Sequence, residues 1–479
     1  MRSAHRVETV RSAERTLMAQ LPPGALMQRA AAGLATACAD ALGRVYGSRV
    51  VLLTGSGDNG GDTLYAGARL AKRGAGVTAV LLAPDRTHPD ALKALRRAGG
   101  TTTTPSAAAD PIARADLVLD GIVGIGGKGG LRPDAAHLAD LVTASRATVV
   151  AVDLPSGIEP DTGEVHGTAL RADLTVTFGT HKPGLLIDPA RAYAGSVRLI
   201  DIGLASTLPA TPDLESLQHA DLAALLPHPA AESDKYRRGV VGIAAGSTRY
   251  PGAAVLAVAG ALRSGAGAVR YVGPAADAVL ARFPETLVSD SGPRKAGRVQ
   301  AWVTGPGAGD DAAPVAEALS TDVPVLLDAD GLRLADVAVV RARTAPTVMT
   351  PHAGEAAALL GVAREEVESA RLTAVRELAR RYDATVLLKG STTLIAGPGD
   401  GTPVRVNPTG TPWLATAGSG DVLSGLTGSL LAAGLAPLDA ASAAAYLHGL
   451  AGRYAANGAP TAAQDVADAI PQAWRDIRA

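Results

Sequence analysis

The sequence has 479 residues, which is enough for two or three domains. Hydrophobic residues make up 47% of it and aromatic residues only 3%, so a core must be built from Ala, Val and Leu, as in α/β proteins with buried parallel strands. The formal net charge of -1 gives no electrostatic reason to expect nucleic acid or an anionic membrane as a partner.

The N-terminal region shows no targeting signal. Residues 1–16 are charged throughout and lack the apolar stretch of a signal peptide. The apolar window 253–269 is short and is interrupted by Arg263, which argues against a membrane span. Cys38 is the single cysteine, which excludes an intrachain disulfide and a thiolate zinc cluster and fits a reducing compartment. We therefore expect a soluble, cytoplasmic protein.

The first part of the chain alternates between helical and strand patterns. Helical periodicity in 8–46 is interrupted at Pro22-Pro23-Gly24, and a buried strand, 49–54, leads into a glycine turn and a helix through Lys72. That order presents a phosphate site at the carboxyl end of a parallel sheet. Further strands are predicted at 77–82, 116–119, 148–152, 174–178 and 197–200. The alternation predicts a Rossmann-like, doubly wound and mainly parallel sheet.

Three polar loops follow strands of this predicted sheet. Residues 55–62 match the dinucleotide pattern G-x-G-x-x-G, but no acidic residue is clearly placed at the end of the next strand, so an ordinary NAD-dependent dehydrogenase is not predicted. A second glycine loop spans 120–130, and a tight turn with an acid and a hydroxyl spans 153–157. Because the carboxyl ends of parallel strands meet at one crevice, we expect one shared site for Asn59, Asp62, Asp120, Asp153 and Ser156.

On these three loops, residues 1 to about 205 resemble the NAD(P)H-hydrate epimerase family, which interconverts the R and S hydrates of damaged NADH or NADPH. The resemblance implies a potassium ion held by Asn59, Asp120 and Ser156, whose hard oxygen atoms suit an alkali cation. It also implies that Asp153 is catalytic. Asp58 stands where the family usually has Asn, and it adds a charge near the phosphates of the ligand. The residues implied to contact the hydrate are Asp58, Asn59, Gly60, Gly61, Asp62, Gly124, Ile125, Gly126, Gly127, Lys128, Gly129, Gly130 and Asp153.

Residues 206–231 lose the periodic pattern and gather prolines, which predicts a linker. We therefore expect an N-terminal epimerase domain over residues 1–212 and a C-terminal domain over residues 225–479. In the second half, predicted strands again end in polar or glycine turns, at 240–253, 305–309, 324–330, 349–355 and 386–393.

The stretch from Thr416 to Gly425 combines a glycine turn, one carboxylate and a helix start. Gly418 and Gly420 allow positive φ angles, and the apolar run that follows predicts a helix with Asp421 in its first turn. Unpaired N–H groups at such a helix start bind a phosphate or a developing oxyanion. An acid among these donors is placed to take a proton from a hydroxyl group, so we predict a catalytic role for Asp421.

Residues 230–479 resemble the ADP-dependent NAD(P)H-hydrate dehydratase family, which has a ribokinase-like α/β fold. The motifs that carry this resemblance are Tyr250-x-Gly252-Ala253, Gly305-Pro306-Gly307, Pro351-His352-x-Gly354-Glu355, Lys389-Gly390-Ser391 and Gly418-Ser419-Gly420-Asp421. The implied hydrate contacts are Ala253, Gly309, His352 and Asp421. The implied nucleotide contacts are Lys389, Gly390, Ser391, Thr392, Thr393 and Gly420. No second histidine lies at metal-binding spacing from His352, so zinc is not expected.

The two resemblances together place the whole chain with the bifunctional NAD(P)H-hydrate repair enzymes. Such an enzyme epimerises the R and S hydrates of NADH and NADPH and dehydrates the S hydrate, converting ADP to AMP and phosphate. The resemblance implies K⁺ in the first domain and Mg²⁺ in the second, small-molecule substrates and a homo-oligomer. The alternatives are a small-molecule kinase of the ribokinase class and a nucleotide-sensing module without turnover. The sequence does not decide whether the enzyme prefers ADP or ATP, or whether it prefers the hydrate of NADH or that of NADPH.

Overall fold

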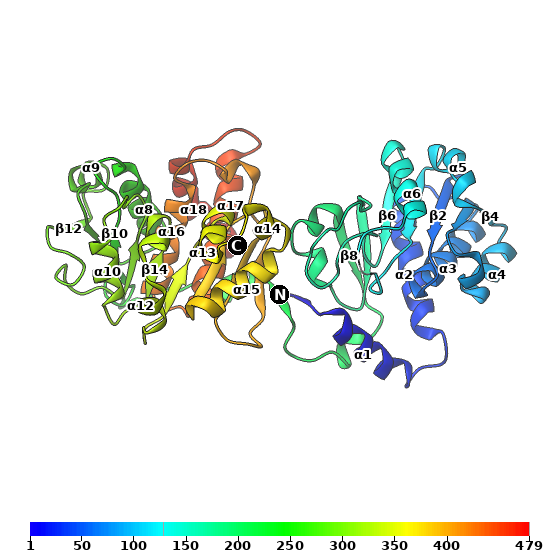
Figure 1. Cartoon of the computed structure of the whole chain (residues 1–479), viewed down its shortest axis with the longest axis horizontal. Coiled ribbons are helices and arrows are strands. Elements are labelled where there is room, and N and C mark those ends of the chain that lie inside the picture. The colour runs from blue at the N-terminus through cyan, green and yellow to red at the C-terminus, as the bar shows by residue number, and fades with distance from the viewer. Residues whose placement is uncertain (128, 479) are drawn as a thin grey trace. The chain divides into compact units, whose positions relative to one another are not determined.

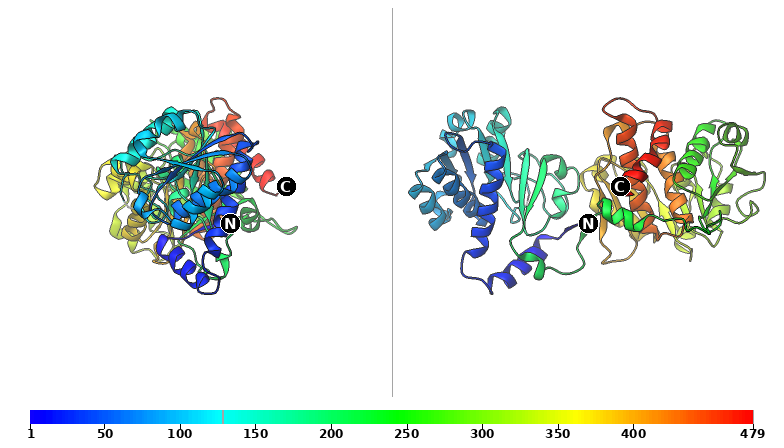
Figure 2. Two further views of the ribbon diagram at one scale, coloured as in Figure 1. Left: turned by 90° about the vertical axis from the view of Figure 1, so that its right-hand side faces the viewer. Right: turned by 180° about the vertical axis from the view of Figure 1, so that it is seen from behind.

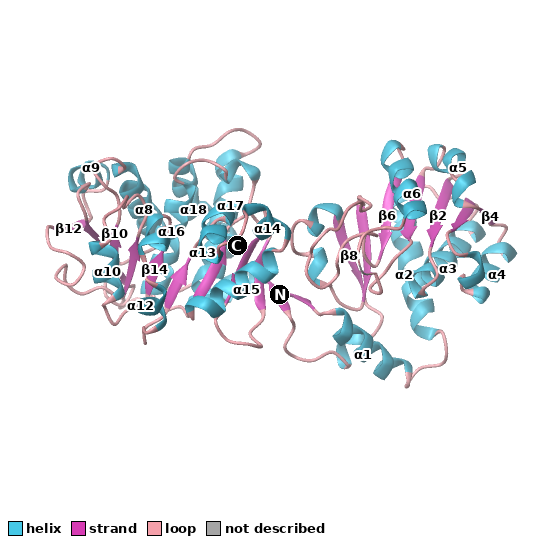
Figure 3. Cartoon of the chain, viewed as in Figure 1, coloured by secondary structure: helices cyan, strands magenta, loops and turns pink. Residues whose placement is uncertain are grey.

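The computed structural model describes residues 1–127 and 129–478, and their contacts divide the chain into two compact units (Figure 1). Residues 3–213 form the N-terminal unit, whereas residues 1–2 and the chain from Leu214 onward form the C-terminal unit. Helices and strands alternate along both units (Figure 3), which confirms the predicted α/β class. No helix within the described residues is long and apolar enough to cross a membrane.

The N-terminal unit is built around a parallel sheet with the strand order β4-β3-β2-β5-β6-β7-β8. The chain leaves β2 toward β3 and β4, then returns to β5 on the other side of β2. Ligands of such sheets bind at the carboxyl ends of the strands where the order reverses. The strands are β2 (Arg49–Thr54), β3 (Gly76–Leu81), β4 (Thr101–Thr103), β5 (Leu117–Gly121), β6 (Thr148–Val152), β7 (Leu174–Phe178) and β8 (Ser196–Ile200). The helices are α1 (Val7–Met18), α2 (Ala25–Leu42), α3 (Asp58–Lys72), α4 (Pro89–Arg97), α5 (Ala109–Ala113) and α6 (Pro133–Ala144).

Both faces of this sheet are buried, as its near-continuous apolar strands require. Val50 and Leu52 of β2 belong to a core that includes residues of α2 and α3, whereas Val51 and Leu53 belong to a second core that includes residues of α6. Each of these buried side chains contributes about 1.5–3 kcal/mol relative to an exposed one. Polar side chains are therefore confined largely to the ends of the strands.

The C-terminal unit contains a sheet with the order β1-β9-β18-β17-β16-β15-β14-β13-β10-β11-β12. The neighbouring strands in the run β16-β15-β14-β13-β10-β11-β12 are all parallel. Strand β17 is antiparallel to both of its neighbours, β16 and β18. The strands are β1 (Arg2–Ala4), β9 (Leu214–Ser216), β10 (Val240–Ala244), β11 (Ala268–Val272), β12 (Leu287–Ser289), β13 (Ala301–Thr304), β14 (Val325–Leu327), β15 (Thr347–Met349), β16 (Thr385–Leu388), β17 (Thr393–Ala396) and β18 (Val404–Asn407). The helices are α7 (His219–Leu225), α8 (Pro251–Arg263), α9 (Ala276–Arg282), α10 (Ala313–Leu319), α11 (Asp330–Leu334), α12 (Val337–Arg341), α13 (Ala353–Leu360), α14 (Arg364–Ser369), α15 (Arg371–Tyr382), α16 (Ser419–Ala432), α17 (Pro437–Ala456) and α18 (Ala463–Arg478).

Close contact between α8 and α16 positions the start of α16. Figure 2 shows α16, α17 and α18 in orange and red, and their apolar residues share one core with those of α8. A Cβ atom added at Gly260 of α8 would lie 2.2 Å from the Val422 carbonyl oxygen, and one added at Gly425 of α16 would lie 1.9 Å from a carbonyl oxygen of α8. Only glycine permits this approach. Leu256 of α8 contacts Gly418, so the N-terminal parts of the two helices are neighbours.

Two expectations from the sequence are wrong. The segment 206–231 is not a linker throughout, because β9 and α7 form within it and both Leu214 and Leu222 are fully buried. A strand of three residues is too short to produce a recognisable periodic pattern. Gly420 does not adopt a positive φ angle, because it lies inside α16; of the two glycines, Gly418 takes the left-handed conformation, with a φ of 87°.

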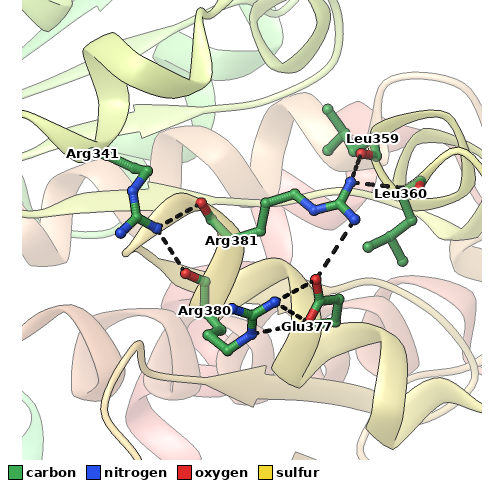
Figure 4. A network of polar contacts seen from close by, with 6 residues as sticks. All are labelled: Arg341, Leu359, Leu360, Glu377, Arg380 and Arg381. Atoms are coloured by element: carbon green, nitrogen blue, oxygen red, sulfur yellow. Dashed lines mark hydrogen bonds and ion pairs between the residues drawn. The ribbon is translucent and has the colours of Figure 1, made fainter.

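An arginine cluster joins three helices of the C-terminal unit (Figure 4). Arg341 of α12 donates hydrogen bonds to the carbonyl oxygens of Arg380 and Arg381 at the end of α15. Arg381 donates to the Leu359 carbonyl oxygen at 2.8 Å near the end of α13, and Glu377 pairs with both Arg380 and Arg381. Cations at helix C-termini satisfy free carbonyl groups and favour the helix dipole. The cluster therefore fixes α12, α13 and α15 to one another.

Candidate active sites

A cavity of about 810 Å³ opens where the strand order of the N-terminal unit reverses. The loops after β2 and β5 and the turn after β6 line it. The predicted hydrate contacts on its wall are Asp58, Asn59, Asp62, Gly124, Ile125, Gly126, Gly127, Gly129, Gly130 and Asp153. Gly60 and Gly61 are buried in α3, and a Cβ atom at Gly60 would lie 2.3 Å from the Gly55 carbonyl oxygen. Lys128 lies outside the described residues.

Asp153 is held on the cavity wall by a buried lysine. Its φ of 66° is a left-handed conformation that is strained for a residue with a side chain. Its Oδ1 accepts hydrogen bonds from Lys182 Nζ at 2.5 Å, from Thr177 Oγ1 at 3.0 Å and from the Phe178 N–H at 3.2 Å. Lys182 is 1% exposed, so the two residues form a buried ion pair. The sequence reasoning missed Lys182, although it lies in a Pro-Gly turn shortly after a predicted strand.

Asp120 and Ser156 are fully buried and bonded to each other. Asp120 accepts hydrogen bonds from the Ser156 N–H at 2.7 Å and from Ser156 Oγ at 2.6 Å. Burial raises the pKa of Asp120 to about 6, and these hydrogen bonds offset only part of the rise. The Val123 N–H donates to Ser156 Oγ, and a Cβ atom at Gly124 would lie 3.1 Å from the Asn59 side chain. The three predicted ion ligands therefore all adjoin the same glycine loop.

Two further acids face this cavity. Asp62 is 8% exposed, and its Oδ1 has no hydrogen-bond partner among the described residues. Burial, together with the carboxyl groups of Asp153, Asp58 and Glu14, raises the pKa of Asp62 well above its usual value. Glu14 reaches the cavity from α1, and burial raises its pKa as well. The sequence reasoning missed Glu14, because helical periodicity does not say which distant loop a helix faces.

The second site lies at the carboxyl ends of β14, β15 and β16, beside the start of α16. Lys389, directly after β16, donates from Nζ to Asp328 Oδ1 at 2.7 Å, and Asp328 directly follows β14. Ser424 Oγ of α16 donates to Asp328 Oδ2, also at 2.7 Å. A Cβ atom at Gly420 would lie 3.5 Å from Lys389 Nζ. The lysine, the buried acid and the glycine turn thus meet at one point.

Asp421 occupies the first turn of α16. Burial, together with the Asp328 carboxylate, raises the pKa of Asp421 to about 7, although the Lys389 ammonium acts in the opposite direction. Burial alone would lower the pKa of Lys389, but the neighbouring Asp328 and Glu355 carboxylates raise it. Asp421 therefore exchanges its proton near neutral pH while Lys389 stays charged, which suits a general base next to a phosphate-binding cation.

His352 caps α13 and connects to Lys389 through Glu355. His352 Nδ1 accepts from the Glu355 N–H at 3.1 Å, and the His352 N–H donates to Glu355 Oε2 at 2.7 Å. The same Oε2 lies 3.8 Å from Lys389 Nζ, and the Lys389 N–H donates to the Pro351 carbonyl oxygen at 2.8 Å. The exposed His352 ring is thereby joined to the loop that holds Lys389.

The loop from Lys389 to Thr393 is fixed by the buried Arg371. Arg371 Nη2 donates to the carbonyl oxygens of Lys389 at 3.0 Å and Thr392 at 3.1 Å. A Cβ atom at Gly390 would lie 2.3 Å from that nitrogen, so a larger residue there would displace the Arg371 guanidinium. The other loop residues differ in burial: Ser391 is exposed, Thr392 is buried and Thr393 is half-buried.

Ala253 and Gly309 follow β10 and β13 at the same edge of the sheet. A Cβ atom at Gly307 would lie 2.7 Å from the Ala253 Cβ, and the Gly309 N–H donates to Asp330 Oδ2 at 2.8 Å. The loop 305–309 therefore brings both residues to this edge. The sequence did not predict the roles of Asp328, Glu355 and Arg371. Asp328 and Glu355 lie inside predicted polar turns, but no sequence motif marks Arg371.

Each unit has glycine turns and acids of raised pKa at the carboxyl edge of its sheet. These features are typical of an α/β enzyme that acts on phosphate-bearing small molecules, here with two sites. Family models match both units: "YjeF-related protein N-terminus" over residues 23–184 and "NAD(P)H-hydrate dehydratase" over residues 241–472. The chain is 51% identical to the bifunctional NAD(P)H-hydrate repair enzyme Nnr of Mycobacterium leprae, over 94% of this chain and 93% of that relative. It is 38% identical to the enzyme of the same name from Corynebacterium glutamicum, over 100% and 99% of the two chains. The chain belongs to the family of bifunctional NAD(P)H-hydrate repair enzymes.

A solved structure supports the fold of the C-terminal unit. It is the ADP/ATP-dependent NAD(P)H-hydrate dehydratase from Bacillus subtilis, co-crystallised with ATP and Mg²⁺. The match has a TM-score of 0.51 and 29% sequence identity, and it covers 55% of this chain and 99% of that one. The predicted ribokinase-like fold is confirmed. The protein is thus a bifunctional isomerase and lyase that repairs hydrated nicotinamide cofactors, as the sequence predicted.

Proposed function

We propose that the two units divide the repair between them. The N-terminal cavity epimerises the R and S hydrates of NADH and NADPH, and the site around Asp421 dehydrates the S hydrate with conversion of ADP to AMP and phosphate. The observation that carries the second assignment is Asp421 itself, an acid with a pKa raised to about 7 at a helix start beside the charged Lys389. The family models match residues 23–184, inside the N-terminal unit, and residues 241–472, inside the C-terminal unit, which supports this division.

Dehydration needs a better leaving group than hydroxide. Asp421 takes the proton of the C6 hydroxyl of the hydrate, whose oxygen attacks the terminal phosphoryl of ADP, and AMP departs. Phosphate then leaves C6, a proton leaves C5, and the ring double bond is restored. The N–H groups in the first turn of α16 and the Lys389 ammonium bind the phosphoryl oxygens as negative charge builds up.

The ligand contacts in this unit follow the same edge of the sheet. Mg²⁺ commonly binds substrate phosphates with one or two carboxylates, and the buried Asp328 carboxylate beside Gly420 fits that role. When bound, the ion neutralises charge on the transferred phosphoryl group. The proposed nucleotide contacts are Lys389, Gly390, Ser391, Thr392, Thr393 and Gly420. The proposed hydrate contacts are Ala253, Gly309, His352 and Asp421.

The epimerase proposal includes a potassium ion at Asn59, Asp120 and Ser156. Asp120 is fully buried, and the hydrogen bonds that it accepts from Ser156 and the Ile122 N–H come from neutral donors. A cation would stabilise this carboxylate, and oxygen ligands suit an alkali ion. Asp153 is the proposed catalytic residue of the cavity, and the glycine loop 124–130 forms its ligand-binding wall.

One assay tests the division of labour and separates the alternatives. Purified full-length protein is given hydrated NADH or NADPH with ADP or ATP, and phosphate release is measured together with the recovery of NAD(P)H absorbance. We expect both signals to appear together and to depend on the hydrate. A small-molecule kinase would instead consume ATP with an alcohol and leave the hydrate unchanged. A sensing module would bind the nucleotide and show neither signal.

The potassium ion and the proposed homo-oligomer have separate tests. Epimerisation in potassium-free buffer should be slow and should recover when K⁺ is added. Asp120→Ala should lose that recovery while ADP-driven dehydration of the S hydrate continues. Light scattering on the full-length protein measures the oligomeric state, and a monomer mass would exclude the homo-oligomer.

A further inference from the structure

The epimerase cavity contains an acid, Asp62, to which the family resemblance gives only a role in contacting the hydrate. Asp62 lies in α3, is more than nine-tenths buried and borders the cavity, yet its Oδ1 has no hydrogen-bond partner in the part of the chain that the structure describes. A buried carboxylate without donors or a cation is costly, whereas the neutral acid is tolerated and keeps a proton to donate. Asp62 thus carries an available O–H group at the cavity wall.

The groups that surround Asp62 differ from those that surround Asp153, the other buried acid of the cavity. The carboxyl groups of Asp153, Asp58 and Glu14 lie near enough to Asp62 to raise its pKa. The cavity is also lined by the charged residues Arg11, Arg86, Arg132 and Asp134, and Lys182 is bonded to Asp153. Asp153 has the lysine, a hydroxyl and an N–H as donors, which favour its ionised form. The cavity therefore presents one neutral and one ionised carboxyl group, a combination that supports acid and base chemistry together.

We propose that Asp62 is the general acid of epimerisation. Asp62 donates its proton to the C6 hydroxyl of the hydrate, the C6–O bond breaks and water leaves, while the lone pair of the ring nitrogen forms a C6–N double bond. A water molecule then adds to the opposite face of C6, and the Asp153 carboxylate takes the proton that this water loses. Asp153 afterwards returns a proton to Asp62 through solvent, which restores the site. The inference rests on the proposed epimerase function of this cavity.

Oxygen exchange tests the bond that this mechanism breaks. Epimerisation by the full-length protein is run in water enriched in oxygen-18, and the C6 hydroxyl is analysed by mass spectrometry. Each turnover should place a solvent oxygen on C6. Retention of the original oxygen during enzymatic epimerisation would overturn the proposal, because it would mean that the ring opens at the C6–N bond instead.

Variants test the residue itself. Asp62→Asn should lower kcat for epimerisation by about 10²–10⁴-fold, as expected for loss of a general acid, with little change in KM. The wild-type rate should fall at high pH as Asp62 loses its proton, and the residual rate of the variant should lack that fall. A raised KM with an unchanged kcat and pH profile would reduce Asp62 to a binding contact.

Controls separate failure of this inference from failure of the proposed function. The denaturant midpoint of Asp62→Asn, measured by far-ultraviolet circular dichroism, should show that the N-terminal unit is folded, and ADP-driven dehydration shows the same for the C-terminal unit. Asp140→Asn removes an exposed carboxyl group from α6 and should leave epimerisation unchanged. Carboxyl carbon NMR on aspartate-labelled protein should show the Asp62 signal titrating well above the usual range of an aspartate, because burial and the neighbouring carboxyl groups raise its pKa. An ionised Asp62 at neutral pH would overturn the acid role, whereas a wild-type protein without any epimerisation would overturn the function of the cavity.

Discussion

Asp421 is the residue on which the proposed dehydration step depends. With a pKa raised to about 7, its carboxyl group is mostly protonated below that pH and mostly ionised above it. A general base acts in its ionised form, so the wild-type dehydration rate should rise with pH through about 7 and then level off. Asp421→Asn should lower the plateau rate by about 10²–10⁴-fold. Phosphate release measures the rate, and calorimetry should show that the nucleotide still binds.

Epimerisation provides the internal control for this variant. R-to-S conversion by Asp421→Asn should equal that of the wild type, because Asp421 belongs to the C-terminal unit and the epimerase cavity is built from the N-terminal unit. Dehydration at the wild-type rate would remove Asp421 from the mechanism.

Lys182 is predicted to stabilise the N-terminal unit through its ion pair with Asp153. Replacing it by methionine removes the cation and leaves a buried carboxylate with two neutral donors. Breaking a buried pair from one side costs about 3–5 kcal/mol of folding free energy. Lys182→Met should therefore lower the denaturant midpoint of the N-terminal unit, measured by far-ultraviolet circular dichroism.

The tryptophans supply the matched control. All three, Trp302, Trp413 and Trp474, lie in the C-terminal unit, so their fluorescence reports on that unit. The fluorescence midpoint of Lys182→Met should stay at the wild-type value. An equal shift by both probes would show that the two units unfold together.

At the scale of single elements, Arg371 of α15 should determine nucleotide affinity. Its side chain fixes the loop after β16 through carbonyl oxygens at both ends of that loop. Hydrogen bonds from a charged donor contribute about 1.5–3 kcal/mol each, so Arg371→Leu should free the loop and raise KM for ADP by roughly tenfold, or about 1.4 kcal/mol. Because Asp421 is untouched, kcat should change little in the phosphate-release assay.

Arg381 of the same helix is the matched control. It also donates to carbonyl oxygens, but those of Leu359 and Leu360 at the end of α13. Arg381→Leu should lower the fluorescence midpoint of unfolding and leave KM for ADP unchanged. If both variants raise KM equally, then general loosening of the helix layer, and not the loop contact, sets nucleotide affinity.

For the whole molecule, we predict that the chain separates into two active pieces. A protease site inserted at the exposed residues 209–211 cuts just before β9. Each unit has its own sheet and core, so the N-terminal piece should keep epimerisation and the C-terminal piece should keep dehydration, when assayed after chromatographic separation. The C-terminal piece loses β1, the edge strand of its sheet, together with the contact between the Met1 ammonium and Asp221, at 2.7 Å, so a loss of stability is expected. Loss of both activities on cleavage, with the uncut protein active, would contradict this division.

The secondary-structure elements and loops that carry both sites could be predicted from the amino-acid sequence. Apolar runs ending in glycine or polar turns placed the loops at 55–62, 120–130 and 153–157 at strand ends, and the stretch 416–425 placed Asp421 in the first turn of a helix. These signals are local, because glycine conformations, strand periodicity and helix starts depend on residues within a few positions. The segment containing β9 was misread because its strand is short and pairs with β18, which lies far along the chain.

The pairing of charged side chains at the two sites could not be predicted from the sequence, because it depends on how the chain folds in three dimensions. Lys182 pairs with Asp153 and Lys389 pairs with Asp328, whereas Asp62 Oδ1 accepts no hydrogen bond within the described residues. The protonation state of each acid follows from its burial and from charges brought near it by strands and helices distant in the sequence. Local periodicity carries no information about such distances in space. The sequence therefore predicted which residue types occur at both sites. It did not predict which of them act as acids, as bases or as positioning groups.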